Sequence, residues 1–219
     1  MEMLEIMRQR HSVRQYTNAP IEAEKQEKLK KMIEEINNST GLHIQIFFDE
    51  PKCFDSMMAH YGKFAGVQNY IALVGKKSPD LDEKLGYYGE KIVLEAQSLG
   101  LNTCWVAMTH GRSMADILKN EKQICLISIG YGATQGVPHK SRPLQELCNY
   151  TPDMPAWFLD GLQSALLAPT AMNQQKFFFE LLPDNTIKAS CGKGFYTKLD
   201  LGIVKYHFEI GAGVCNRKI

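Results

Sequence analysis

The chain has 219 residues, of which 44% are hydrophobic, enough for the core of one large domain or two small ones. Its 25 basic and 24 acidic side chains leave a net charge of +1, which excludes the globally basic surface of a non-specific nucleic-acid or membrane binder. No segment reaches the roughly 18 apolar residues of a membrane-spanning helix, and the first ten residues lack the apolar core of a signal peptide. We expect a globular, cytoplasmic protein without nucleic-acid or membrane partners.

The cysteines do not form a pattern typical of disulfides or metal sites. They are spread along the chain without a CxxC pair or zinc-like spacing to histidine, at Cys53, Cys104, Cys125, Cys148, Cys191 and Cys215. Cys104 and Cys125 lie in apolar runs, which favours buried small hydrophobic residues over nucleophiles. We therefore predict no metal ligand and no catalytic side chain among them.

The first part of the chain reads as helices alternating with strands. Apolar residues at Leu29, Ile33 and Ile36 predict an amphipathic helix, and the cluster at 37–41 predicts the turn that ends it. Gly100 is placed to end a long helix. Helices are predicted at residues 1–9, 21–36, 81–99 and 113–119, and strands at 42–48, 70–75, 102–108 and 123–130.

The second part begins with a proline-rich connector at 138–155 and repeats the first part in outline. Helices are predicted at 156–167 and 200–213, and strands at 176–182 and 186–190. The spacing of Gly89 and Gly100 recurs in Gly202 and Gly213. We expect an α+β fold with a mixed central sheet covered by helices. Residues 1–150 would form one repeat and 151–219 a shorter, degenerate one, together a single compact unit.

Three segments could bind an anion or a planar ring. In Arg10-His11-Ser12-Val13-Arg14, an extended backbone would project Arg10, Ser12 and Arg14 to one face, where two guanidiniums and a hydroxyl suit a phosphate. A solvated basic turn is the alternative for this segment taken alone.

The second segment follows the predicted strand that ends at Gly130. Glycine there lets a backbone approach a ligand closely, and Lys140 and Arg142 add positive charge. An ordinary surface turn explains these residues equally well.

The third segment leaves a helix through Pro169, which forces the preceding residue out of helical geometry. Small residues then expose backbone amides, and Asn173 can both donate to and accept from a heterocyclic ring edge. An ordinary helix stop is the alternative.

Together these segments resemble the FMN-dependent nitroreductase family. Arg10, Ser12 and Arg14 match its Arg-x-Ser-x-Arg or Lys element, and residues 168–175 match its Ala-Pro-Ser-x-x-Asn-x-Gln loop with Thr170 in place of serine. Lys140 and Arg142 match a basic Lys-x-Arg after a glycine-ended strand, and residues 100–106 look like its Gly-Leu-Gly-Ser-x-Trp-Ile run.

The order of these elements departs from the family, because the Pro-Ser loop usually precedes the basic pair. Family members are dimers whose flavin sites take the arginine element from one subunit and the loop from the other. The chain therefore resembles a fused pseudo-dimer type, in which one chain supplies both halves. That implies one complete flavin site and favours a monomer.

The resemblance also implies a role for each segment. Arg10, Ser12, Lys140 and Arg142 would hold the FMN phosphate, and Arg14 the pyrimidine edge of the flavin. His11 would be a packing or ribityl neighbour, and the backbone near Ala107 and Met108 would lie by flavin N5. The remaining ring edge would face the loop formed by Pro169, Thr170, Ala171 and Asn173.

The implied activity is ping-pong oxidation of NAD(P)H, with a small electron-poor acceptor such as a nitroaromatic or quinone. The flavin would carry the chemistry, so no catalytic side chain is expected. An FMN-binding sensor or store without turnover is one alternative, and a flavin-free interaction module is another.

Overall fold

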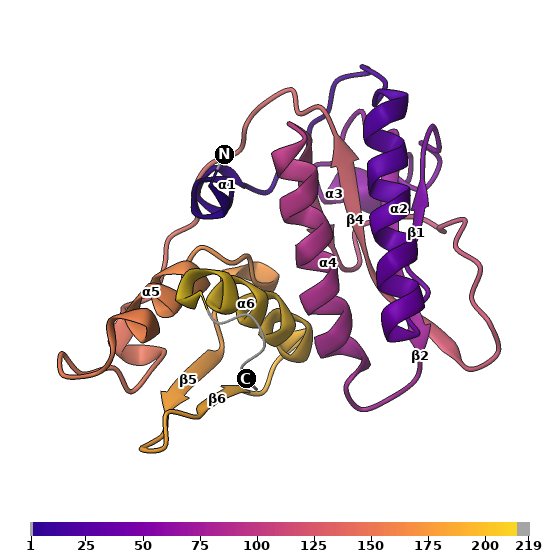
Figure 1. Ribbon diagram of the computed structural model, residues 1–219. Helices are drawn as coiled ribbons and strands as arrows, with labels where there is room; N and C mark the ends of the chain where they lie inside the picture. The colour runs from indigo at the N-terminus through magenta and orange to yellow at the C-terminus, as the bar shows by residue number, and fades with distance from the viewer. Residues whose placement is uncertain (1, 214–219) are drawn as a thin grey trace. The chain divides into compact units, whose positions relative to one another are not determined.

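The computed structural model describes residues 2–213, which divide into two compact units (Figure 1). The sheet unit comprises Gln9–Leu81 and Ile92–Val137. The hairpin unit comprises Met1–Arg8, Asp82–Lys91 and Pro138–Ile219, as far as these ranges are described. The division places the first helix and the whole 138–155 connector in the hairpin unit, which differs from the predicted boundary at residue 150.

The sheet unit contains four strands in the order β1 (Gln45–Phe47), β2 (Asn69–Lys76), β4 (Glu121–Gly130) and β3 (Asn102–Val106). All three pairings are antiparallel, where the sequence had predicted a mixed sheet. A parallel component is present as an isolated bridge between Ser12 and Thr103, at the free edge of β3. The predicted strands at 70–75, 102–108 and 123–130 are confirmed with small changes of their ends.

Side chains of the sheet alternate between two buried faces, as β-strands require. Ile71 and Leu73 point to one face, which α2 (Ala23–Thr40) and, of helix α4 (Leu81–Ser98), the part from Ile92 onward cover in Figure 1. Tyr70 and Ala72 point to the other face, where they pack in a cluster with buried residues of loops and the short helix α3 (Met57–Tyr61). Both sides of the sheet are therefore closed to water.

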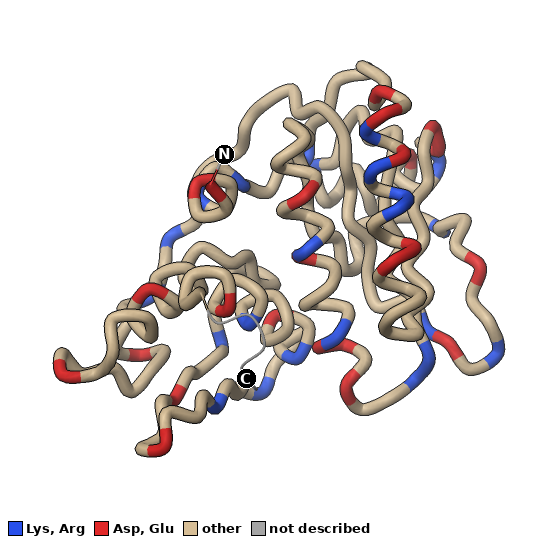
Figure 2. The backbone as a smooth tube through the Cα atoms, viewed as in Figure 1, with Lys and Arg blue, Asp and Glu red and all other residues tan. Residues whose placement is uncertain are grey.

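Helix α2 is longer than predicted. Its buried face carries Leu29, Ile33 and Ile36, as the apolar spacing indicates, while acidic and basic residues alternate along its exposed side (Figure 2). The predicted turn at 37–41 is wrong for its first four residues, which form the last helical turn. The Thr40 hydroxyl donates to Ile36 O at 2.6 Å, and the helix ends at Gly41 with φ of 71°.

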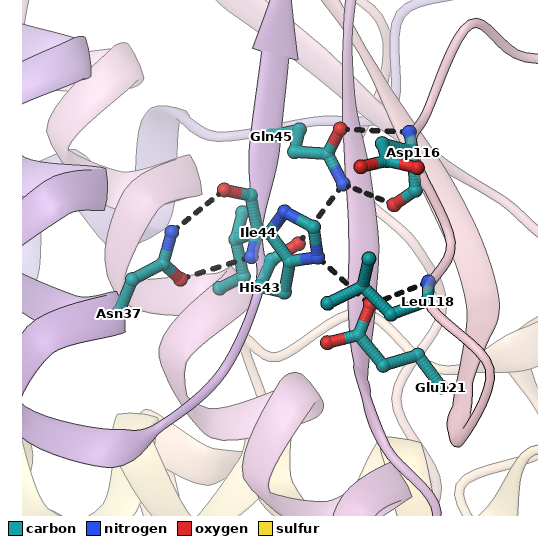
Figure 3. A network of polar contacts seen from close by, with 7 residues as sticks. All are labelled: Asn37, His43, Ile44, Gln45, Asp116, Leu118 and Glu121. Carbon is teal, nitrogen blue, oxygen red and sulfur yellow. Dashed lines mark hydrogen bonds and ion pairs between the residues drawn. The ribbon is translucent and has the colours of Figure 1, made fainter.

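The predicted helix at 113–119 is also wrong, because residues 111–118 form an irregular segment. Figure 3 shows what holds it. The Gln45 amide donates to Asp116 O at 2.8 Å and accepts from Asp116 N at 2.9 Å. Glu121 accepts from Leu118 N at 3.0 Å, and its same oxygen lies 2.8 Å from His43 Nδ1. Side chains from β1 and β4 thus take the backbone bonds that a helix would need.

Helix α3 was not predicted. It has only five residues and begins after Ser56, whose hydroxyl accepts from Ala59 N at 3.2 Å. Such a short helix carries too few turns for an apolar period to show in the sequence.

The hairpin unit contains α1 (Met3–Gln9), α5 (Ala156–Ala165), the hairpin β5 (Phe177–Leu181) and β6 (Ile187–Cys191), and α6 (Thr197–Ala212). Two 3₁₀ turns are added, η1 (Leu144–Glu146) and η2 (Ala171–Asn173). Phe179 stacks on Phe208 with ring centroids 4.6 Å apart, and Phe158 lies edge-on to Phe208. The predicted helices and strands of this part are confirmed. No helix within residues 2–213 is long and apolar enough to cross a membrane.

Within the hairpin unit, the first half of α4 crosses α6 at two glycines. A Cβ on Gly86 would lie 2.0 Å from Leu199 O, and one on Gly202 would lie 1.9 Å from Glu83 O. Leu199 lies three residues before Gly202, and Glu83 lies three residues before Gly86. Each glycine therefore faces a carbonyl at the same distance along the chain from the other glycine, which is the reciprocal pattern of a two-fold contact. Only glycine permits so close an approach of two helix backbones.

Candidate functional site

The Arg10–Arg14 segment of the sheet unit is fixed through its backbone. Val13 N donates to Thr103 O at 3.0 Å, which joins the segment to the free edge of β3. On the other side Ala65 N donates to Arg14 O at 3.0 Å. The Val13 side chain is buried in the core cluster, so the backbone direction of this segment is set by the sheet.

Three side chains of this segment affect the thiol of Cys104 in β3. The pKa of the Cys104 thiol is raised by burial, while the positive charges of Arg14 and Arg10 and a hydrogen bond with Ser12 act to lower it. Arg10 is buried and Arg14 is exposed, so the three share one neighbourhood but not one exposed face. A cation and a hydroxyl group therefore lie close together here, as an anion site requires. The protonated, buried thiol is a packing group.

A loop that follows β4 packs against the same segment. His11 Nδ1 lies 3.3 Å from Gln135 O, and partial burial lowers the pKa of His11. Gly136, with φ of 67°, would place a Cβ 2.8 Å from His11 Cβ. Gly132 N donates to Asn102 Oδ1 at 2.9 Å. Gly136 thus permits a close approach of this loop to the Arg10–Arg14 segment. A Cβ on Gly130, where the sequence suggested approach to a ligand, would lie 3.2 Å from the Tyr16 ring.

Ala107 and Met108 lie where β3 ends. Ala107 is half-buried and Met108 is 71% exposed. They begin the bend at residues 107–110, which precedes the irregular segment 111–118. Gln45 and Glu121 hold Asp116 and Leu118 of that segment (Figure 3). The two residues that the sequence assigned to the neighbourhood of flavin N5 are therefore half-buried and exposed, respectively.

In the hairpin unit, the loop 168–175 is a strained piece of backbone. Met172, Asn173 and Gln175 have φ values of 51°, 54° and 45°, in the left-handed region that non-glycine residues rarely adopt. Each costs of order 1 kcal/mol or more, and such residues concentrate at ligand sites. The Thr170 hydroxyl accepts from Gln175 N at 3.1 Å, so threonine supplies the hydroxyl that serine provides in the family pattern.

Gln175 joins this loop to the basic loop. Its side chain is buried, donates from Nε2 to Lys140 O at 3.0 Å and accepts from Arg142 N at 2.8 Å. Asn173 Nδ2 also donates to Lys140 O at 2.8 Å. The structure therefore brings together the two candidate segments of the hairpin unit, which are about thirty residues apart in the sequence.

The two cations of the basic loop, Lys140 and Arg142, differ in whether another side chain already pairs with them. Arg142 pairs with Glu146, with Nη2 and Oε2 at 2.5 Å, in an exposed ion pair. Lys140 and Asn173 are exposed, whereas Pro169, Thr170 and Ala171 are half-buried. Lys140 is therefore the more available cation of the pair for a phosphate.

The candidate residues thus form two groups, one in each unit. Arg10, Ser12 and Arg14 gather in the sheet unit, and Lys140, Arg142 and the Pro169 loop in the hairpin unit. That both groups serve a single flavin stays a prediction.

The family model described as “Putative TM nitroreductase” matches residues 2–212. The chain belongs to this family. Among proteins with curated descriptions, none matches the chain.

Solved structures show the same nitroreductase-like α+β fold. A crystal structure described as a putative nitroreductase from Thermotoga maritima is 22% identical with a TM-score of 0.68, and the match covers 96% of this chain and 83% of that one. A putative nitroreductase in complex with FMN from Desulfovibrio desulfuricans is 19% identical with a TM-score of 0.54, covering 70% and 98%. A putative NADH dehydrogenase/NAD(P)H nitroreductase from Bacteroides thetaiotaomicron is 23% identical with a TM-score of 0.51, covering 66% and 95%.

In this nitroreductase-family chain, sequence reasoning missed the residues that support the candidate segments. Gln175 stands in the family-like loop, yet its contacts with Lys140 and Arg142 are not visible in a linear pattern. Asp200 and Gln174 also support that loop, and an acidic residue in the first turn of a helix looks like an ordinary helix-terminus charge.

Proposed function

We propose that this protein is an FMN-dependent NAD(P)H oxidoreductase of nitroreductase type. The observation that carries the proposal is that Arg10, Ser12 and Arg14 all act on the Cys104 thiol of β3, the strand that Ala107 and Met108 follow. Family membership supports the reaction class. A nitroreductase-fold relative from Desulfovibrio desulfuricans is described as an FMN complex.

The chemistry of the donor set fits FMN. Guanidinium, ammonium and hydroxyl groups suit a phosphate, and we assign Arg10, Ser12, Lys140 and Arg142 to it. Arg14 is exposed and carries a cation suited to the pyrimidine edge, where positive charge favours the reduced flavin. Loop 169–173, with its exposed Asn173, is assigned to the rest of the ring edge.

Bound FMN would supply hydride transfer at N5, from NAD(P)H and then to a small electron-poor acceptor such as a nitroaromatic or quinone. The protein residues bind and orient, so no catalytic side chain is assigned. Cys104 stays protonated because burial raises its pKa. His11, whose pKa is lowered by burial, is assigned to packing beside the cofactor rather than to proton transfer.

We further propose that the chain is an internal pseudo-dimer. Apart from the short helix α3 between β1 and β2, the order helix, strand, strand, helix occurs in α2, β1, β2 and α4, and again in α5, β5, β6 and α6. The reciprocal contact of Gly86 with Gly202 supports equivalence of α4 and α6. This replaces the weaker pairing of Gly89 with Gly202 that the sequence spacing suggested. A chain carrying both halves is expected to be a monomer.

The test is the absorption spectrum of the purified protein, followed by anaerobic addition of NADH or NADPH. The proposal predicts a yellow protein whose flavin band bleaches and returns on adding a quinone or nitroaromatic. A yellow protein that stays oxidised would instead be an FMN sensor or store. A protein that is colourless after incubation with FMN and removal of the free FMN would contradict flavin binding altogether.

A further inference from the structure

Asp200, in the first turn of α6, has a buried carboxylate that accepts two hydrogen bonds from the strained loop 168–175. It is 4% exposed. Its Oδ1 accepts from Ala171 N at 2.9 Å and its Oδ2 from Gln174 Nε2 at 2.7 Å. These two donors lie on either side of the left-handed Met172 and Asn173. One side chain therefore fixes both ends of the turn that carries the assigned ring-edge contacts.

No neighbouring positive charge contributes to the pKa of Asp200. Burial raises the pKa of Asp200 to about 6, against the lowering effect of hydrogen bonds from Ala171 and Gln174. Charged side chains on the neighbouring elements include Lys198, Lys205 and Glu209 of α6, Asp160 of α5, Lys176 before β5 and Glu83 of α4. Lys205 pairs with Glu83 at 2.6 Å, and Lys176 donates to Lys193 O at 3.1 Å. None of these charges is a cause of the shift.

The direction of this shift means that the ionised carboxylate does not stabilise the fold. A folded-state pKa raised above the ordinary 3.8 gives stability that is present at low pH and is lost as the pH rises through about 6. At neutral pH the charge is therefore kept at a cost in stability. Such a cost is typical of residues retained for a site rather than for the fold.

We propose that Asp200 is a positioning residue for FMN, whose carboxylate holds the amides of loop 170–174 in the arrangement that binds the flavin edge. This rests on the proposed function. Protonation of Asp200, or its replacement by asparagine, sets a hydrogen donor against the Gln174 amide, which also donates to Phe195 O at 2.8 Å. The turn then loses one of its two attachments.

The experiment measures FMN affinity from pH 5 to pH 8 for the wild type, Asp200→Asn and the control Asp160→Asn, an exposed aspartate on α5 of the same unit. The FMN phosphate itself titrates near pH 6, so the quantity compared is the ratio of affinities at each pH, in which that titration cancels. We expect Asp200→Asn to bind about tenfold more weakly than Asp160→Asn at pH 8. The ratio should approach one at pH 5, where wild-type Asp200 is itself protonated.

Two further readouts separate positioning from a structural role. Thermal unfolding of Asp200→Asn without FMN should occur no lower than that of the wild type at pH 8, because the variant removes a buried charge. Amide exchange at Ala171 should be faster in the variant. If Asp200→Asn fails to fold, Gln174→Ala should weaken FMN by about threefold.

The outcomes are distinct. An affinity loss that is constant with pH and accompanied by a lower melting temperature would assign Asp200 a structural role and overturn the proposal. Equal affinities of Asp200→Asn and Asp160→Asn at pH 8 would overturn it while the proposed function stands. Absence of FMN binding in the wild type and in Asp160→Asn would overturn the proposed function and this inference together.

Discussion

Two of the three candidate segments are held by different kinds of interaction. The Arg10–Arg14 segment is fixed by backbone hydrogen bonds to Thr103 and Ala65, so its side chains can vary without moving the chain. Loop 168–175 is fixed by the side chains of Gln175 and Asp200, and its backbone is strained.

This difference predicts where substitutions act. In the sheet unit, the backbone approach itself is the sensitive feature, and a change of a donor side chain should alter binding alone. In the hairpin unit, a change of a supporting side chain should alter the loop and binding together. The four predictions below test this contrast, from the largest expected effect to the smallest.

Gly66→Ala should cause the largest loss of stability. Gly66 has φ of 69° and a Cβ there would lie 2.3 Å from Tyr16 O, so the backbone next to Arg14 must shift. The matched control is Gly41→Ala, with φ of 71° and no atom within 4 Å of the new Cβ. We expect losses of about 3 kcal/mol and about 1 kcal/mol, measured by urea unfolding. Equal losses would contradict the close backbone approach.

Gln175→Ala should affect both stability and binding. It removes the acceptor of Arg142 N and leaves Lys140 O with Asn173 as its remaining side-chain donor, at a cost of about 2 kcal/mol. FMN affinity should fall about thirtyfold. Gln163→Ala, an exposed glutamine on α5, should change neither quantity. Unchanged FMN binding by Gln175→Ala would show that the loop does not need its link to the basic segment.

Arg14→Ala should weaken FMN by about tenfold and leave the unfolding transition unchanged, because this exposed side chain is not needed by the backbone. Its loss should also lower the flavin reduction potential. Arg112→Ala, an exposed arginine of the same unit, is the control for charge. A potential equal to that of the wild type would contradict the placement of Arg14 at the pyrimidine edge.

Glu146→Gln should have the smallest effect and the opposite sign. It releases Arg142 from an exposed ion pair and should tighten FMN by about twofold at low salt, an advantage that disappears at high salt. Glu180→Gln in β5, which pairs with Lys188 at 3.5 Å, serves as the control. Weaker binding by Glu146→Gln would mean that Glu146 orients Arg142 for the phosphate.

Much of the fold could be predicted from local patterns. The long helix α4 and the inner strand β2 carry strong periodic or apolar signals, and their boundaries agree closely with prediction. The errors at residues 37–40 and 113–119 have one cause, which is that side chains such as Gln45 and Thr40 take part in backbone hydrogen bonding.

The candidate site divides in the same way. Arg10, Ser12 and Lys140 could be predicted as candidate site residues because their side chains are themselves phosphate-binding groups. Gln175 and Asp200 could not, because their role depends on contacts with residues about thirty positions away. The residues that support a site through such contacts therefore cannot be predicted from a single sequence.

The central proposal is that one chain binds one FMN and that both Arg14 and Asn173 contribute to its affinity. The measurement is a calorimetric titration of FMN into the wild type, Arg14→Ala and Asn173→Ala, with the mass in solution determined on the same samples. We predict a single site per monomeric chain, weakened in both variants. Full wild-type affinity in either variant would contradict the assignment of that residue to FMN.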